Sequence, residues 1–149
     1  PWSVTALTAL EVADAEPALA AAEAGEAPCL AEAFAVARVQ EERLLLDHMV
    51  RLGQQTAYER VAHFMIELQR RLQAAGLGDS QRFPLPLTQE ILADALGLSV
   101  VHVNRTLQQL RREGLIELRS GVAILLKPDI MAQIADYGAM ASHQAKRPA

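Results

Sequence analysis

Residues 99–105 read Ser-Val-Val-His-Val-Asn-Arg, so two valines stand beside an imidazole, a carboxamide and a guanidinium. The valines occupy positions 100 and 101, where the solvent-facing start of a helix usually carries polar residues. Three kinds of structure would explain the pattern: an enzyme loop, a packed core helix, or a helix whose methyl and donor groups read DNA bases. The neighbouring elements decide between them.

Two short helices are predicted to position these side chains. Thr88 is a favourable N-cap for a helix of little more than two turns, Gly97 supplies a tight turn, and Ser99 caps the second helix. The buried side of the second helix is predicted to consist of Val103, Leu107 and Leu110. Two short helices joined by a glycine-containing turn are typical of a helix-turn-helix.

A β-hairpin is predicted directly after the second helix. After Gly114, the stretch LIELRSGVAILLKP contains two β-runs around Arg119, Ser120 and Gly121. A hairpin in this place makes the motif a winged helix. The preceding stretch GLGDSQRFPLPL, residues 76–87, reads as a linker because it is rich in Gly and Pro.

A long helix is predicted over residues 28–52, ended by Gly53, and a second helix over 54–76 has a wider apolar stripe that closes a core. Apolar residues of the long helix recur at three- and four-residue steps: Leu30, Phe34, Ala37, Leu44, Leu45, Met49 and Leu52. This narrow seam favours a dimerisation helix over 28–53, with packing on its own domain as the alternative. His63, with Glu67 four residues later, is interpreted as structural.

The two ends of the chain carry weaker patterns. The stretch SVTALTALEV, residues 3–12, alternates like a strand, and a short helix led by Pro17 follows. One strand cannot bury itself, so residues 1–27 are interpreted as the remnant of a larger domain. The winged-helix domain is expected over 54–138, closing with a short helix capped by Asp129, and residues 139–149 are expected to form a flexible tail.

Composition limits the function classes. The chain has 149 residues, a net charge of −4 and a single cysteine, Cys29, which excludes a disulfide within the chain and a cysteine metal cluster. A net negative charge argues against non-specific coating of nucleic acid but allows a local basic face. No paired carboxylates, nucleophile–base set, phosphate loop or metal spacing appears, so an enzyme is not expected. No membrane span or signal peptide is recognised, and a cytoplasmic location is expected.

The stretch LTQEILADALGLSVVHVNRTLQQLRREGLIEL, residues 87–118, resembles the DNA-binding domain of the Crp/Fnr family of bacterial transcription regulators. QEERLLLDHMVRLGQQTAYERVAHFMIELQRRL, residues 40–72, resembles the end of that family's dimer helix and the first helix of its DNA-binding domain. SVTALTALEVADAE, residues 3–16, resembles the last strand of its effector-binding β-roll. The resemblance implies a mainly α fold, in which a long dimerisation helix precedes a winged helix-turn-helix domain with a small β-hairpin wing.

The resemblance also implies partners. A homodimer would bind a palindromic operator in double-stranded DNA and regulate transcription, with RNA polymerase as a further candidate partner. A cyclic nucleotide or another small effector would be sensed by the β-roll of the full-length protein, and no cofactor is expected in this fragment. The alternative is a winged-helix module that binds another protein and does not read DNA. Salt-sensitive duplex binding separates the two.

The predicted DNA-contacting residues are Thr88, Gln89, Ser99, Val100, Val101, His102, Asn104, Arg105 and Arg119. Cyclic-AMP-responsive members of the family carry an Arg-Glu pair where this chain has Val100 and Val101, so their target sequence does not transfer. Valine methyls can pack on thymine methyls, and Arg105 can bond a guanine edge or a phosphate. Burial of the valines under a neighbouring domain, and solvated charge at Arg119, remain the alternatives.

Overall fold

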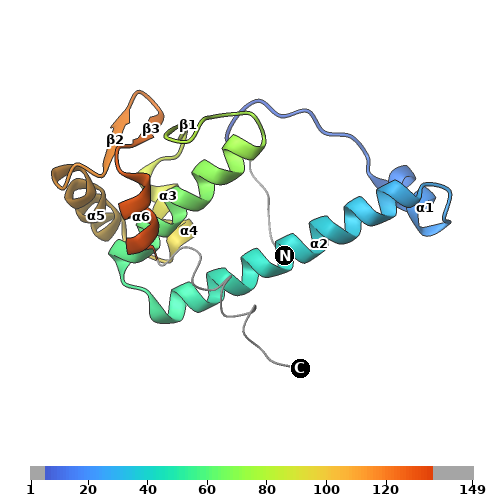
Figure 1. The fold of residues 1–149 in the computed structure, drawn as a ribbon, viewed down its shortest axis with the longest axis horizontal. Coiled ribbons are helices and arrows are strands. Elements are labelled where there is room, and N and C mark those ends of the chain that lie inside the picture. Colours follow the sequence, from blue (N-terminus) through green and yellow to red (C-terminus); the bar gives the residue numbers. More distant parts are fainter. Residues whose placement is uncertain (1–5, 136–149) are drawn as a thin grey trace. The chain divides into compact units, whose positions relative to one another are not determined.

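The computed structural model describes residues 6–135, which form six helices and three strands. The chain divides into two units, residues 1–53 and 54–149. Figure 1 shows a long helix in the first unit and a cluster of helices beside a small sheet in the second. The predicted mainly α class with a winged helix-turn-helix is confirmed.

The first unit contains two helices, α1 (Glu16–Glu23) and α2 (Pro28–Gln54). The strand predicted over residues 3–12 is wrong for its described part, because residues 6–15 adopt no strand. A strand needs a hydrogen-bonding neighbour, and the three strands of the described region pair only with one another. The short helix expected after Pro17 is confirmed, with Glu16 as its first residue.

Helix α2 runs through Gly53, so the prediction that this glycine ends the helix is wrong. A single glycine costs a helix only about 0.5–1 kcal/mol relative to alanine. The break comes at Thr56, whose side chain accepts a hydrogen bond from the backbone N–H of Glu59, while the Glu59 carboxylate accepts one from the Thr56 N–H at 2.7 Å. This capping box starts α3 (Ala57–Ala74), three residues later than predicted.

The apolar residues of α2 are not covered. No apolar residue among the described residues of the first unit is buried. Of the predicted seam, Phe34 and Leu44 are half-buried and the rest are exposed: Leu30, Ala37, Leu45, Met49 and Leu52. A second exposed row, on the opposite side of the helix by its spacing, was not expected and consists of Val36, Val39, Leu46 and Val50. The seam is therefore one of two apolar rows.

The second unit is built around α3, which packs against α5 (Val100–Arg112), α6 (Pro128–Ile134) and strand β1 (Arg82–Pro84) (Figure 1). Helix α4 (Gln89–Leu96) packs against α5. The largest fully buried side chains are Phe83, Met65, Leu110, Leu125, Met131, Val61 and Val103. Because they come from helices and strands alike, one core holds the whole unit together.

The sheet has three antiparallel strands in the order β1-β3-β2, with β2 at Ile116–Arg119 and β3 at Val122–Leu125. The predicted hairpin is confirmed, but the linker interpretation of residues 76–87 is wrong, because β1 lies inside that stretch. Phe83 is 1% exposed and pairs with Ala123. The Asp79 side chain accepts hydrogen bonds from the N–H groups of Gln81 and Arg82 at 2.8 and 2.7 Å, which lowers the pKa of Asp79 and turns the chain into β1.

Helix α6 begins after Lys127, with Pro128 in its first turn and no side-chain cap. The prediction that Asp129 caps this helix is wrong, because Asp129 lies inside the first turn. Proline fixes φ near the helical value and so starts the helix without a capping hydrogen bond. The predicted tail, residues 139–149, lies outside the described residues.

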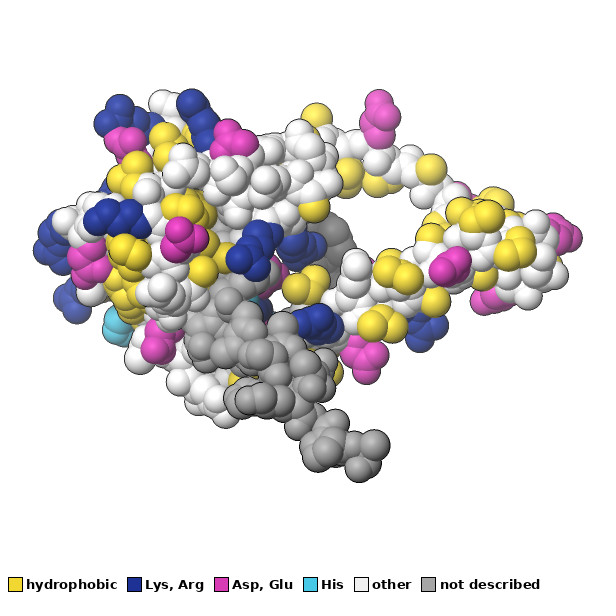
Figure 2. Space-filling view, in the orientation of Figure 1, with side chains coloured by type: hydrophobic (Ala, Val, Ile, Leu, Met, Phe, Trp, Pro, Cys, Tyr) yellow, Lys and Arg dark blue, Asp and Glu magenta, His cyan; other side chains and the backbone are white. Residues whose placement is uncertain are grey.

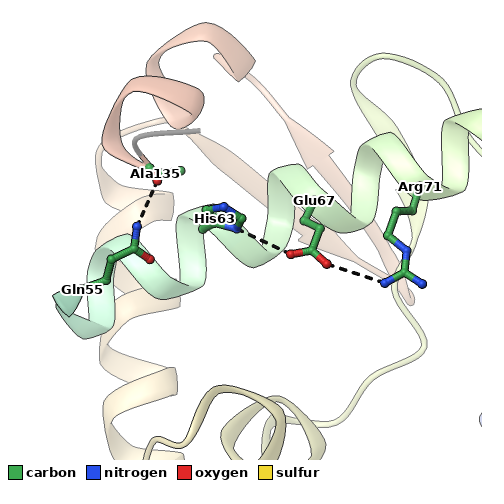
Figure 3. A network of polar contacts seen from close by, with 5 residues as sticks. All are labelled: Gln55, His63, Glu67, Arg71 and Ala135. Carbon is green, nitrogen blue, oxygen red and sulfur yellow. Dashed lines mark hydrogen bonds and ion pairs between the residues drawn. The ribbon is translucent and has the colours of Figure 1, made fainter. Parts of the chain in front are cut away.

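Polar contacts line α3 (Figure 3). Nδ1 of His63 lies 3.6 Å from one carboxylate oxygen of Glu67, and a guanidinium nitrogen of Arg71 lies 3.6 Å from the other. Both pairs are four residues apart on the helix, the spacing at which side chains meet. Just before α3, Nε2 of Gln55 donates to the carbonyl of Ala135 at 3.1 Å. These contacts agree with a structural role for His63.

Candidate nucleic-acid interface

The turn between α4 and α5 sets the direction of α5. Thr88 Oγ1 accepts from the Ile91 N–H at 3.2 Å, and Ser99 Oγ accepts from the His102 N–H at 3.3 Å, so both predicted N-caps are present. Gly97 lies between them with φ +61° and ψ +40°, a left-handed conformation that favours glycine. Ala93, 3% exposed, lies on the buried side of α4. Two capped helices and a one-glycine turn therefore form the predicted helix-turn-helix.

The valine pair that opens α5 lies on the surface. Val100 is 41% exposed and Val101 is 58% exposed, while Val103, three residues after Val100, is 0% exposed. Leu107, Leu110 and Thr106 complete the buried side of the helix. Packing within the described part of the chain thus leaves the two valines uncovered, so the core that these residues form does not explain them.

The polar side chains of this surface differ in the hydrogen bonds that they already make within the chain. Arg105 is exposed and makes no hydrogen bond or ion pair with another described residue. His102 is exposed, and its Nδ1 lies 2.8 Å from Ser99 Oγ, which ties the imidazole to the cap. Asn104 is half-buried and donates from Nδ2 to Oε1 of Gln89 at 2.9 Å. The guanidinium of Arg105 is therefore the freest donor on the surface.

Helix α5 is basic although the whole chain is acidic. Its sequence VVHVNRTLQQLRR contains Arg105, Arg111 and Arg112 and no acidic residue. In Figure 2, both basic and acidic side chains lie over the part of the second unit where Figure 1 places α5 and the β2–β3 hairpin. The N-terminal ends of helices add a partial positive charge, which favours a phosphate near Thr88 and Gln89. The basic character is therefore a property of α5 itself, since acidic residues such as Glu90, Glu113 and Glu117 lie on the neighbouring segments.

The wing turns at Ser120 and Gly121, which have φ of +48° and +74°. Positive φ at both central residues is the geometry of a tight two-residue hairpin turn. Arg119, at the end of β2, is exposed and forms an ion pair with Glu117. Arg111 donates to the carbonyl of Leu118 at 3.4 Å, so this arginine contacts the wing, and not the carbonyls of its own helix. A groove of about 270 Å³ lies between the wing and the start of α4, and its lining includes Gln89, Arg111 and Arg119 together with five leucines.

The last residues of α5 are tied to α3. The Tyr58 hydroxyl donates to a carboxylate oxygen of Glu113, and Gln109 Nε2 donates to the other at 2.9 Å. Burial, followed by the hydrogen bond and the charge of Glu113, raises the pKa of Tyr58 to about 12. The hydrogen bonds from Tyr58 and then Gln109 lower the pKa of Glu113. The C-terminal end of α5 is thus anchored while its N-terminal end faces solvent.

Two features of the surface were not predicted. Gln108 is exposed and stands seven residues after Val101, on the face that also carries Arg105. Its spacing was the signal that would have revealed it. The hydrogen bond between Gln89 and Asn104 joins residues fifteen positions apart, and no sequence period connects them.

The described residues offer few alternatives to a binding surface. No group of three or more histidine, cysteine or acidic residues among them is arranged to hold a metal ion. None of the helices within residues 6–135 combines the length and the apolar character that crossing a bilayer requires.

Comparison with known proteins agrees with the geometry. Residues 59–134 match the model of the Crp-like helix-turn-helix domain. The chain is 43% identical over 82 residues to the nitrogen fixation regulation protein FixK of Bradyrhizobium diazoefficiens, covering 55% of this chain and 34% of that protein. It is 35% identical over 106 residues to FixK of Azorhizobium caulinodans, covering 71% and 43%. The chain thus matches less than half the length of these two relatives.

A solved structure gives the same result. The structure of FixK2 from Bradyrhizobium japonicum superposes with a TM-score of 0.65 at 30% identity and covers 75% of this chain and 55% of that one. Because these relatives are regulators, the prediction that the chain is not an enzyme is confirmed. The chain belongs to the Crp/Fnr family of bacterial transcription regulators, and it contains the Crp-like helix-turn-helix domain of that family.

Proposed function

We propose that the chain is the part of a transcription regulator that binds a specific DNA sequence, with the first turns of α5 in the major groove. The observation that carries this proposal is the exposed pair Val100 and Val101 beside the free guanidinium of Arg105. Apolar methyls and charged donors on one helix end are the groups that read thymine methyls and purine edges. A helix that only closed a core would not leave them uncovered.

The proposed contacts fall into two classes. Val100, Val101, His102, Asn104 and Arg105 face the bases from α5. Ser99, Thr88 and Gln89 lie at the starts of α5 and α4, where backbone N–H groups and short polar side chains hold phosphates. Arg119 would hold a phosphate from the wing and would have to share its guanidinium with Glu117. The first class would set sequence preference and the second orientation.

Helix α2 would pair with a second copy of the chain. Its predicted seam consists of Leu30, Phe34, Ala37, Leu44, Leu45, Met49 and Leu52. Leu45 and Met49 are each 61% exposed, and no apolar residue of this unit is buried among the described ones. A two-fold dimer would present two α5 helices to a palindromic operator, about one turn of DNA or roughly 34 Å apart.

The dimer proposal is tested with two matched substitutions. Leu45 lies on the predicted seam at 61% exposure, and Val39 lies on the opposite row at 65%. Leu45→Asp should shift sedimentation toward the monomer, because it introduces a charge between the helices, while Val39→Asp should leave the dimer intact. Monomers of the unmodified chain at tens of micromolar would refute the dimer, and dissociation by Val39→Asp alone would place the contact on the other row.

The domain limits remain part of the proposal: 1–27 as the remnant of the effector-binding β-roll and a short helix, 28–53 as the dimerisation helix, 54–138 as the winged-helix domain and 139–149 as the tail. A cyclic nucleotide or another small effector would act on the β-roll that the family resemblance places before α2. RNA polymerase is a further proposed partner, and the cytoplasm, where a bacterial chromosome lies, is the proposed location.

The proposed DNA binding is tested by selection and titration. Duplexes are selected from a random pool by the chain, and the selected and scrambled duplexes are then titrated at several salt concentrations. The logarithm of the association constant should fall linearly with that of salt, by about 0.9 per phosphate neutralised. Arg38→Ala, which removes one exposed charge on α2, should leave the preference for the selected duplex unchanged.

Two outcomes would contradict the proposal. Failure to enrich any sequence, with no salt-dependent binding, would favour the winged-helix module that binds another protein. Equal affinity for selected and scrambled duplexes would leave a DNA-binding protein without sequence preference.

A further inference from the structure

One hydrogen bond connects the start of α4 with the exposed face of α5. Asn104 Nδ2 donates to Gln89 Oε1 at 2.9 Å. Gln89 is the first residue of α4 and is exposed, whereas Asn104 is half-buried in the second turn of α5. Because Asn104 is three residues after Val101 and next to Arg105, it borders the face that these two residues form.

The hydrogen bond to Gln89 determines which donor and acceptor groups of Asn104 stay available for a ligand. A carboxamide carries two N–H donors and one carbonyl acceptor in a plane. One N–H of Asn104 is engaged by Gln89, so Oδ1 and the second N–H remain for a ligand. Adenine shows an acceptor, N7, beside a donor, the N6 amino group, at its major-groove edge, and a carboxamide can bond both at once. The remaining groups of Asn104 match this edge.

The bond also determines the orientation of both side chains. The torsion that turns the plane of an asparagine carboxamide has a broad profile, so the torsion alone does not hold the plane in one orientation. When the NH₂ group of Gln89 donates to a phosphate, Oε1 of Gln89 faces Asn104, where it attracts the NH₂ group and repels the carbonyl, and so favours one of the two orientations of the Asn104 amide. Gln89 keeps its own NH₂ group, which can donate to a phosphate at the start of α4.

We propose that Gln89 is a positioning residue that orients the carboxamide of Asn104 to read an adenine in the DNA half-site. The proposal rests on the proposed DNA binding. It makes Gln89 different from a simple phosphate contact, because its loss changes the preference at one base pair. Asn104 is then the specificity-determining residue at that base pair, and Gln89 acts through it.

The test separates positioning from phosphate binding with Gln89→Lys. Lysine keeps a donor for phosphate but has no acceptor, so Oδ1 of Asn104 would turn toward it and away from DNA. Glu90→Gln, at the neighbouring exposed residue, changes the net charge by the same one unit and leaves the pair intact. Each variant of the whole chain is melted by circular dichroism to confirm folding and titrated against selected duplexes that differ at single base pairs.

The unmodified chain should prefer adenine at one position by about 5- to 150-fold, and Asn104→Ala should abolish that preference. Gln89→Lys should reduce it at the same position while affinity for scrambled duplexes holds or rises. The double variant Gln89→Lys with Asn104→Ala should lose no more of the preference for adenine than Asn104→Ala alone, and Glu90→Gln should keep the full preference.

Three results would overturn the inference. Full preference in Gln89→Lys would show that Asn104 needs no partner. No change of preference in Asn104→Ala, or a change at a base other than adenine, would remove Asn104 from adenine reading. All of these presuppose selective binding by the unmodified chain, and its absence would instead refute the proposed function together with this inference.

Discussion

Replacement of Arg105 by alanine should change DNA binding without changing the stability of the fold. Arg105 is exposed and has no hydrogen bond or ion pair with another described residue, so its loss should change the free energy of unfolding by no more than about 0.5 kcal/mol. Alanine is also the best helix former. Any change in DNA binding by Arg105→Ala would therefore come from the interface.

The expected magnitude depends on what the guanidinium contacts. Arg105 is the sixth residue of α5, which places it about 9 Å along the helix from the Ser99 cap, within the turns that enter the groove. A bidentate contact with a guanine edge is worth roughly 1–3 kcal/mol, or about 5- to 150-fold in affinity for the selected duplex. A phosphate contact would weaken all duplexes alike and reduce the salt slope by about 0.9.

Arg112→Ala is the matched control, because it removes the same charge about 10 Å further along α5. Fluorescence anisotropy titrations at several salt concentrations would compare both variants on selected and scrambled duplexes. Arg105→Ala should lose affinity for the selected duplex and relax one base pair, whereas Arg112→Ala should keep the preference. Equal losses on both duplexes for Arg105→Ala would identify a phosphate contact and refute base reading.

Three further predictions concern the elements that hold this surface. Ser99→Ala should lower the free energy of unfolding by about 1 kcal/mol in urea melts, with Ser99→Asn restoring it, because the cap of α5 is lost; an unchanged midpoint would contradict this. Leu110→Ala, at a side chain 0% exposed, should cost about 2–5 kcal/mol in the same assay, while exposed Gln108→Ala should change little. Because the pKa of Glu113 is lower in the folded chain than its ordinary value of about 4.5, its contribution to stability should be lost as the pH falls from about 4.5 through the pKa of the folded chain. Because the pKa of Tyr58 is raised to about 12 in the folded chain, its contribution to stability should be lost as the pH rises from about 10 to 12. Glu113→Gln should flatten the acid side and Tyr58→Phe the alkaline side of a stability-against-pH curve, and unchanged slopes would show that the pair is not formed in solution.

Local sequence patterns were sufficient to predict the helix caps and the turn between α4 and α5, because these features form their hydrogen bonds with nearby residues. Thr88 and Ser99 could be recognised as caps because a short polar side chain before an apolar period serves the free N–H groups of a helix start. Gly97 could be recognised because the turn requires a left-handed residue. Each of these signals lies within a few residues of the bond that it forms.

The sequence alone was insufficient where the partner is distant or absent. Arg82–Pro84 became a strand because Phe83 enters the core beside Ala123, about forty residues later, and three residues cannot show a period. The stretch at residues 6–12 has the alternation of a strand but forms none, because no described strand pairs with it. An alternating sequence allows a β-strand, but the strand forms only where a neighbouring strand supplies hydrogen-bond partners.

The interface shows the same division. The sequence determined that Val100, Val101 and Arg105 share the open end of a capped helix, because periodicity assigned Val103, Leu107 and Leu110 to the buried side. Only the tertiary structure decided that Asn104 meets Gln89. That contact depends on the angle at which α4 and α5 cross, which the turn at Gly97 and the packing of the two helices against each other set together.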